Sequence, residues 1–334
     1  MKRAISLICL LIFVVPMIGH AARLYLDPAR DVLQAGDAVM LAVRLDIDQA
    51  EDVCINAADV ILTYPDSLRA VDTSTRNSIF PLWIEPPTID ESRNRVTFAG
   101  GIPNGYCGRI EGDPGVTNVL AEVVFRSTTG QLYTDVSEME IATIVFADSI
   151  ALYVNDGFGT KLVPETHGAD ITLLPTVGPQ IRDPWREIVQ ADLTPPEPFS
   201  IYLERDSALF DGDYFIVFNT TDKQSGLSHF EVMEEPLAEQ QLFRFGQVGA
   251  PWVQARSPYR LRDQTLNSTI RVRAIDKAGN EYIATLVPDP ALRTRVIQPL
   301  EWVLIGLGGG VLLVLGWILW NLNRRRPTLM EHDK

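Results

Sequence analysis

Catalytic residue types are present in this 334-residue chain, but they do not form a known catalytic constellation. Of the four histidines, His167 and His229 fall in different predicted domains. No nucleophile-elbow, zinc-protease, P-loop or Rossmann pattern occurs between the two apolar end segments. Carboxylates are plentiful, yet none stands in a motif typical of a glycosidase pair. The sequence therefore predicts a protein that is not an enzyme and that requires no cofactor.

Three aspartates are the candidates for a metal site. Asp148, Asp156 and Asp170 could each offer oxygen atoms to calcium, because hard cations take several oxygen ligands. Their spacing matches no EF-hand loop. The alternative is that they are solvated turn residues, so a bound calcium ion stays an open expectation.

Two cysteines remain once the apolar N-terminal segment, which contains Cys9, is set aside. Cys54 and Cys107 form an even pair in a chain that carries an export signal, and this predicts a disulfide. Two free buried thiols are the alternative. No CxxC or Cys/His cluster occurs, which argues against a structural zinc site.

The two ends of the chain predict where it works. Residues 1–21 have a basic start, an apolar middle and a small-residue exit at Gly19–Ala22, the pattern of a signal peptide. An uncleaved N-terminal anchor is the alternative. Near the other end, the uncharged run Trp302–Trp320 would span about 28 Å as a helix, close to the hydrocarbon thickness of a bilayer.

The flanks of this second segment support a membrane helix at 300–321. Trp302 and Trp320 stand near its ends, where indole rings favour the membrane interface. Arg324, Arg325 and Arg326 follow and predict a cytoplasmic tail at 322–334. Gly306 and Gly310 lie four residues apart, a spacing that would permit a weak homodimer through the helix. We expect a single-pass protein of the cell membrane with its N-terminal region extracellular.

The net charge of −14 limits the classes of partner. An acidic surface repels nucleic acid, and it suits cationic partners or divalent ions. Solubility alone is the plainer explanation of the charge. Nucleic acid is not expected as a partner.

The chain between the end segments is predicted to be all-β. Apolar and polar residues alternate along several short segments of 22–174, which indicates a β-sandwich. Residues 175–198 are rich in proline and read as a semi-rigid linker with one helical turn near Trp185–Glu187. About seven short strands in 199–290 fit a smaller immunoglobulin-like or fibronectin-like sandwich. The alternating segments of the first region are 39–45, 60–64, 96–98, 121–125 and 141–145.

The first region resembles the cohesin family over about residues 23–174. The resemblance lies in the order and spacing of short motifs rather than in one diagnostic motif. It implies a jelly-roll β-sandwich that binds dockerin modules on one flat sheet face, as in polysaccharide-degrading complexes. The motifs are Ala35–Asp37, Val60–Pro65, Asn77–Phe80, Val96–Gly105, Leu120–Phe125 and Asn155–Thr160.

The resemblance also points to residues that would contact a partner. In cohesins that bind dockerin, polar residues near the start of the third strand contribute contacts. Asp59 falls on such a position, whereas Ala57 stands where the polar partner would be, and this departs from the family pattern. The candidate binding residues are Asp59, Asn77, Trp83, Asn104 and Tyr106.

The second region looks like the immunoglobulin-like or fibronectin-like modules of bacterial surface proteins, which are usually spacers. The residues are Asp222–Leu227, Ser257–Tyr259 and Arg271–Asn280. Together these features predict a membrane-anchored extracellular scaffold protein that recruits another extracellular protein. The alternatives are a carbohydrate-binding adhesin, which would use Trp83, and a passive surface stalk.

Overall fold

The structure is a computed structural model, and it describes residues 22–48, 53–109, 117–128, 139–175, 181–237, 250–294 and 310–321. The predicted signal peptide at 1–21 lies outside the described residues. So do Trp302, Gly306 and the three arginines at 324–326. The predictions made for these residues therefore stay predictions.

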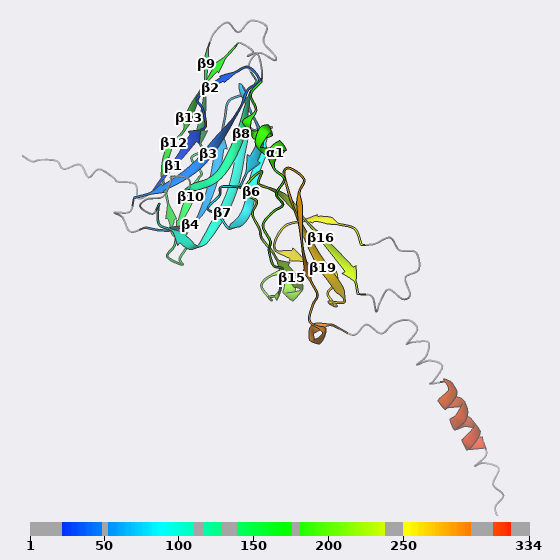
Figure 1. Cartoon of the computed structure of the whole chain (residues 1–334). Helices are drawn as coiled ribbons and strands as arrows, with labels where there is room; N and C mark the ends of the chain where they lie inside the picture. The colour runs from blue at the N-terminus through cyan, green and yellow to red at the C-terminus, as the bar shows by residue number, and fades with distance from the viewer. Residues whose placement is uncertain are drawn as a thin grey trace, which may run out of the picture.

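The first domain consists of two β-sheets packed face to face (Figure 1). One sheet has the order β12-β1-β3-β8-β5. The other has the order β11-β10-β4-β9-β13-β2, with β7 paired to β4 and β6 paired to β7. The strands are β1 (Ala22–Pro28), β2 (Val32–Gln34), β3 (Ala38–Ile47), β4 (Ile55–Thr63), β5 (Leu68–Ser74), β6 (Leu82–Asp90), β7 (Arg95–Tyr106), β8 (Val119–Ser127), β9 (Glu140–Phe146), β10 (Ala151–Val154), β11 (Lys161–Leu162), β12 (Glu165–His167) and β13 (Ala169–Leu174).

The core of this domain follows the alternation of its strands. Leu41 and Val43 of β3 point from one sheet into the core, and Val60 of β4 and Phe98 of β7 meet them from the other sheet, all fully buried. Side chains two residues apart share a face of a strand, so each strand contributes every second residue to the core. The predicted β-sandwich is confirmed for the described residues of this region.

The proline-rich linker contains a helix longer than the predicted single turn. Helix α1 (Pro184–Ala191) begins after Asp183, whose carboxylate accepts the backbone N–H of Arg186 at 3.0 Å. Proline at the first helical position and an aspartate cap favour a helix start. Trp185 packs with Ala38 and Val124 on the outer face of the five-stranded sheet. The helix therefore covers a sheet face instead of acting as a free spacer.

The second domain is a smaller pair of sheets and has seven strands, in agreement with the number predicted. The strand orders are β14-β15-β18 and β17-β16-β19-β20. Its core includes Ile216, Phe218 and Val272. The elements are β14 (Tyr202–Arg205), η2 (Phe210–Gly212), β15 (Tyr214–Val217), β16 (Leu227–Pro236), β17 (Val253–Ala255), β18 (Tyr259–Arg260), β19 (Ser268–Asp276), β20 (Glu281–Leu286) and η3 (Pro290–Leu292).

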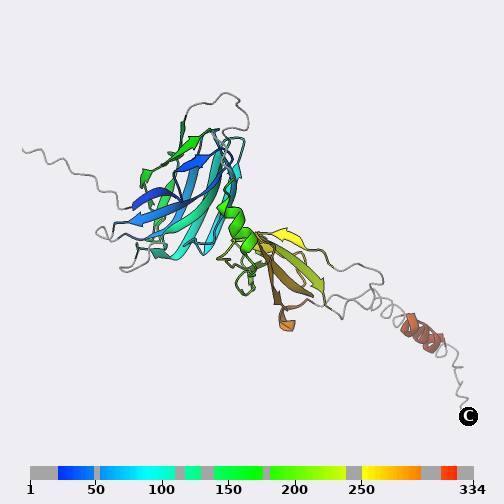
Figure 2. The same cartoon turned by 45° about the horizontal axis from the view of Figure 1, so that its top comes forward.

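The two domains meet beside α1 (Figure 2). Asp72 of β5 accepts the indole N–H of Trp185 at 2.6 Å and also pairs with Lys277 from the second domain. Arg76 donates to the backbone oxygen of Gln224 at 3.4 Å. The side chains of Arg76 and Lys277 both lie over the Trp185 ring. Both domains and the linker thus share one cluster of contacts, which we call the junction.

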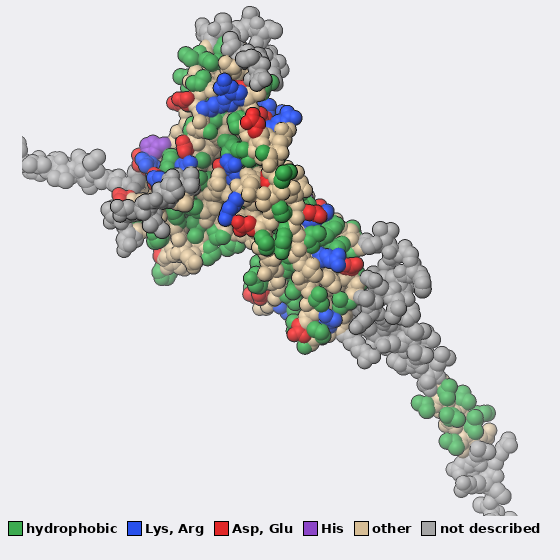
Figure 3. All heavy atoms as spheres, in the orientation of Figure 1, with side chains coloured by type: hydrophobic (Ala, Val, Ile, Leu, Met, Phe, Trp, Pro, Cys, Tyr) green, Lys and Arg blue, Asp and Glu red, His purple; other side chains and the backbone are tan. Residues whose placement is uncertain are grey.

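Part of the predicted membrane segment is described. Residues 310–321 form a helix whose large apolar side chains are exposed, Trp317 by 62% and Trp320 by 54%. Figure 3 shows hydrophobic side chains over the visible surface of this helix. Among the described residues, no helix is both long enough and apolar enough to cross a membrane.

Gly100 of β7 is expected to tolerate no side chain. A Cβ added at this position would lie 2.4 Å from Cδ2 of Phe80, which is fully buried in the core. Gly100→Ala should therefore destabilise the first domain by about 1–3 kcal/mol through overpacking. Denaturant unfolding measures the loss. Gly101→Ala is the matched control, because its Cβ would come no closer than 3.4 Å to the Asn56 oxygen, and equal losses for both variants would contradict this packing.

Candidate functional site

The outer surface of β10, β4, β7 and β6 is the candidate site. Strand register places Asp59 of β4 opposite Ala151 of β10 on one side and Ala99 of β7 on the other. Residues directly opposite in neighbouring strands share a face of the sheet. The flanking residues Ala58 and Val60 are buried in the core, so the row through Asp59 faces away from it. We call this surface the trough face.

Most residues in the middle of the trough face have a very small side chain or none. A second row of the ladder joins Tyr153, Ala57, Gly101 and Leu82 in that order across the four strands. The inner positions of the two rows, on β4 and β7, are alanine or glycine except for Asp59, which is the single charged group among them. Small side chains let an approaching element come close to the sheet. The surface is therefore suited to a helix or strand of a partner.

Larger apolar groups border the trough face on both sides. Leu82 and Ile84 of β6 are 49% and 77% exposed. Ile84 is the extra residue where the β6–β7 register shifts, and such a bulge redirects a side chain out of the strand. On the opposite side Tyr153 carries Lys161 over its ring. These groups could bury apolar area against a partner seated on the trough.

The loop between β10 and β11 presents a further exposed ring. Phe158 is 90% exposed. The Asp156 carboxylate holds the loop by accepting the Thr160 hydroxyl and the Phe158 backbone N–H, the latter at 2.9 Å. The hydroxyl of Thr160 and then the N–H of Phe158 lower the pKa of Asp156. The loop therefore holds its phenylalanine outward with an ionised aspartate at its base.

The disulfide predicted from the cysteine count is present. Cys54 and Cys107 are bonded, with their Cα atoms 4.1 Å apart. Cys54 directly precedes β4 and Cys107 directly follows β7, and Ile55 pairs with Tyr106 beside them. The bond closes the end of the β4–β7 ladder that carries the trough face.

Removal of this disulfide should weaken the first domain. A cross-link between residues 53 positions apart reduces the entropy of the unfolded chain. We expect the Cys54→Ala, Cys107→Ala double variant to lose about 2–4 kcal/mol of unfolding free energy. Denaturant unfolding under oxidising conditions checks this value. Wild-type protein under reducing conditions should match the double variant, and an unchanged midpoint would refute the expectation.

The structure separates the five predicted binding residues. Asp59 lies in the middle of the trough face. Asn77 instead donates to Glu122 Oε1 at 3.0 Å beside the Arg76–Glu122 ion pair, in the other sheet. Trp83 turns inward and makes edge contacts with the Phe80 and Phe98 rings.

Asn104 and Tyr106 stand at the end of β7 near the disulfide. The backbone oxygen of Asn104 accepts Asn155 Nδ2 at 3.3 Å, and the Tyr106 ring packs against the core. They border the trough face but do not form its centre. Trp83, which a carbohydrate-binding adhesin would use, is partly buried against the core and does not stand beside them as an exposed ring.

The three aspartates predicted for calcium do not converge. Asp148 and Asp156 are exposed in turns, and Asp170 accepts the Thr143 hydroxyl at 2.7 Å on the surface of the sheet. Among the described residues, the carboxylates that do gather within possible metal-binding distance belong to Asp192, Asp222 and Asp276. These residues lie in the linker and the second domain, 30 to 84 positions apart in sequence, so no local motif reveals them.

Sequence reasoning also missed the border of the trough face. Leu82, Ile84 and Phe158 were not predicted as contact residues. Phe158 stands between two glycines at 157 and 159, and an aromatic residue in such a turn is a signal for exposure. Ile84 gave no such signal, because its exposure depends on the bulge in β6.

No protein-family model matches this chain, and no curated protein matches it either. Several solved structures do match part of it. A chain of a type I cohesin–dockerin complex from Clostridium thermocellum is 10% identical, with 46% of this chain and 94% of that chain covered and a TM-score of 0.34. The sixth cohesin of scaffoldin B from Acetivibrio cellulolyticus is 17% identical, with 46% and 99% covered and a TM-score of 0.33.

A cohesin module of a family 33 glycoside hydrolase from Clostridium perfringens is 10% identical, with 45% of this chain and 96% of that chain covered and a TM-score of 0.33. At such identities and TM-scores no residue role passes from these proteins to this one. All three solved structures are cohesin modules or complexes that contain one, and the first domain of this chain is similar to them.

Proposed function

We propose that this protein is a non-catalytic, membrane-anchored extracellular receptor that holds another extracellular protein on its trough face. The observation that carries the proposal is the run of alanine and glycine around Asp59, bordered by exposed apolar side chains. An exposed sheet face normally carries large polar side chains at these positions. A face without them accepts a partner at close range.

The chemistry of the trough face indicates the chemistry of its partner. Asp59 makes no ion pair with any described residue, and Glu85 lies two strands away on β6, in the same row across the sheet. Two carboxylates on a largely apolar surface suit a partner with lysine, arginine or hydroxyl donors at the centre of its contact. Leu82, Ile84 and Tyr153 suit apolar residues around that centre. A short amphipathic helix with a basic or hydroxyl-bearing stripe meets both requirements.

The similarity to cohesins suggests a dockerin-like module as the partner class. The C. thermocellum structure is a complex of a cohesin with a dockerin. Ala57 departs from the family pattern in this chain. We therefore expect a partner whose contact residues are adapted to a small residue at that position.

Three features support the membrane anchor. The helix at 310–321 has exposed apolar side chains and no charged residue. The sequence continues the apolar run back to Trp302 and places three arginines directly after Asn323. The basic and apolar start of the chain supports export. A receptor held in this way would keep its bound protein at the cell surface.

Affinity capture with the full chain tests the proposal. The chain is purified in detergent and immobilised, exported proteins of the same organism are passed over it, and retained proteins are identified. We expect one exported protein to bind wild type with a measurable Kd and to be lost with Asp59→Arg. A retained protein that binds both forms equally, or a blank result with wild type, would contradict the proposal.

A further inference from the structure

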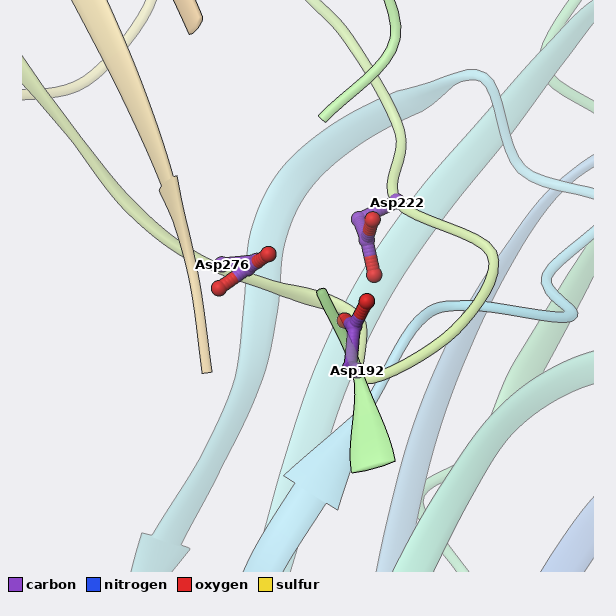
Figure 4. Close-up of side chains that lie close together, drawn as sticks. All are labelled: Asp192, Asp222 and Asp276. Carbon is purple, nitrogen blue, oxygen red and sulfur yellow. The ribbon is translucent and has the colours of Figure 1, made fainter. Parts of the chain in front are cut away.

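Three aspartates from distant parts of the chain converge beside the junction. Asp192 follows the last residue of α1, Asp222 lies in the loop after β15, and Asp276 is the last residue of β19. One carboxylate oxygen of each lies within 4.8 Å of the others. Figure 4 shows the Asp222 and Asp192 carboxylates turned toward one another, with Asp276 beside them.

These carboxylates are buried without a basic partner. Their exposed fractions are 6%, 2% and 2%. Among the described residues no lysine or arginine forms an ion pair with any of them, and Lys277, the neighbour of Asp276, pairs with Asp72 instead. Their hydrogen bonds come mainly from backbone N–H groups, such as Thr194 to Asp192 and Gly226 to Asp222. Burial of several negative charges without a cation is strongly unfavourable.

A buried serine adjoins the same cluster through its backbone. Ser225 is fully buried, and within the described part of the chain its Oγ has no hydrogen-bond partner. The backbone N–H of Ser225 donates to Asp192 Oδ2 at 3.1 Å, which holds the residue beside the carboxylates. Both hydrogen bonds to the Asp222 side chain go to Oδ1, at 2.7 Å from Gly226 and 3.1 Å from Gln224. Asp222 Oδ2 therefore accepts no hydrogen bond from the described residues, and the neighbouring Ser225 hydroxyl is buried without a partner.

The spacing fits a hard divalent cation. For three oxygens no more than 4.8 Å apart, one point lies within about 2.8 Å of all of them, and Ca²⁺ takes oxygens at about 2.3–2.6 Å. Burial, and then the charges of Asp192 and Asp276, raise the pKa of Asp222. A cation between the carboxylates would remove this repulsion, because it supplies the missing positive charge.

We propose that Asp192, Asp222 and Asp276, together with the Ser225 hydroxyl, bind a calcium ion that fixes the junction between the two domains. The ion would tie the end of α1 to the 222–226 loop and to the end of β19. The same loop reaches the first domain, because the Gln224 oxygen accepts Arg76. The residue after Asp276 reaches it too, through the Lys277–Asp72 pair. This site is separate from the trough face and does not depend on the receptor function.

Calcium titration of the full chain tests the site. The protein is purified in detergent, stripped with EDTA and titrated with CaCl2 in a calorimeter, and thermal unfolding is recorded with EDTA and with saturating CaCl2. We expect one calcium ion per chain and a rise of about 10 °C or more in the unfolding midpoint of the second domain at 100 times Kd. Asp222→Asn should weaken calcium binding at least about tenfold. Asp170→Asn, which changes an exposed aspartate outside the cluster, should leave it unchanged.

The sign of the effect on stability separates a calcium site from an accidental cluster. Asp222→Asn relieves repulsion, so in EDTA its unfolding midpoint should equal or exceed that of wild type, and in CaCl2 it should fall below wild type. Ser225→Ala keeps all three carboxylates and should weaken calcium binding about tenfold even if Asp222→Asn fails to fold. The proposal would be overturned if wild type bound no calcium. It would also be overturned if Ser225→Ala bound calcium as tightly as wild type and the unfolding midpoint of Asp222→Asn lay above that of wild type in both buffers.

Discussion

Ala99→Arg is expected to weaken binding of the captured protein partner at least about 100-fold while the first domain stays folded. Ala99 lies opposite Asp59 in the centre of the trough face. An arginine there would extend over the alanine and glycine surface and would offer its guanidinium to Asp59. The shape and the charge that the partner uses would be lost together. Calorimetric titration of the partner into the full chain measures the loss.

The matched control places the same side chain on the other sheet. Glu165 lies on β12, at the edge of the five-stranded sheet, and its side chain is 48% exposed. Glu165→Arg should bind the partner with the affinity of wild type. Equal weakening by both variants would point to a general effect of charge, and an unaffected Ala99→Arg would exclude the trough face as the site.

Trp185→Ala is expected to release the two domains from each other. The ring is 6% exposed, packs on Ala38 and Val124, and carries two cations over its faces. Its indole N–H donates to Asp72, which also holds Lys277 from the second domain. Truncation of a buried tryptophan typically costs about 3–5 kcal/mol, and here the loss falls on the packing of α1 against the first domain and on the contacts with Lys277 of the second. The radius of gyration from small-angle scattering should increase, and proteolysis within 175–198 should accelerate.

Arg186→Ala is the control for this experiment. Arg186 is the next residue of α1, it is exposed, and its backbone N–H, which bonds Asp183, is kept in the variant. Its scattering curve should match wild type. A Trp185→Ala protein with the scattering curve and cleavage rate of wild type would show that the domains are held by contacts other than those around α1.

The β-sandwich could be predicted from the sequence because its signal is local. In β3, Leu41 and Val43 alternate with half-exposed residues, and burial in the structure follows the same period. The Cys54–Cys107 bond also followed from the cysteine count together with the predicted export signal. Strand β8 departs from the period, since Val124 on its outer face is buried by Trp185 of the linker. A residue 61 positions away in sequence decides that burial.

The binding residues were predicted less well because their orientation depends on pairing between strands. The side chain of Trp83 faces Gly100, whose missing Cβ leaves room for the Phe80 ring, and the tryptophan joins that aromatic cluster. The side-chain amide of Asn77 donates a hydrogen bond to Glu122, a buried carboxylate that requires donors. Neither neighbour can be inferred from local sequence. The outward face of Asp59 follows from strand alternation alone, and its role as a contact residue stays a prediction.

The linker helix has a signal in the sequence. Asp183 followed by Pro184 is an N-cap with proline at the first helical position, which marks a helix start. The many prolines before and after it favoured an extended linker instead. The acidic cluster of Asp192, Asp222 and Asp276 left no such signal, because it exists only once β15, β19 and the linker have been brought together.

Photocrosslinking from the trough face tests the central claim most directly. A photoreactive amino acid is introduced in place of Glu85, in the row of Asp59, or in place of Glu165 on the other sheet, and each full-length protein is irradiated with its captured partner. We predict a covalent complex from position 85 and none from position 165. Crosslinks from position 165 alone, or bound partner without crosslinks from position 85, would contradict a receptor that binds through this face.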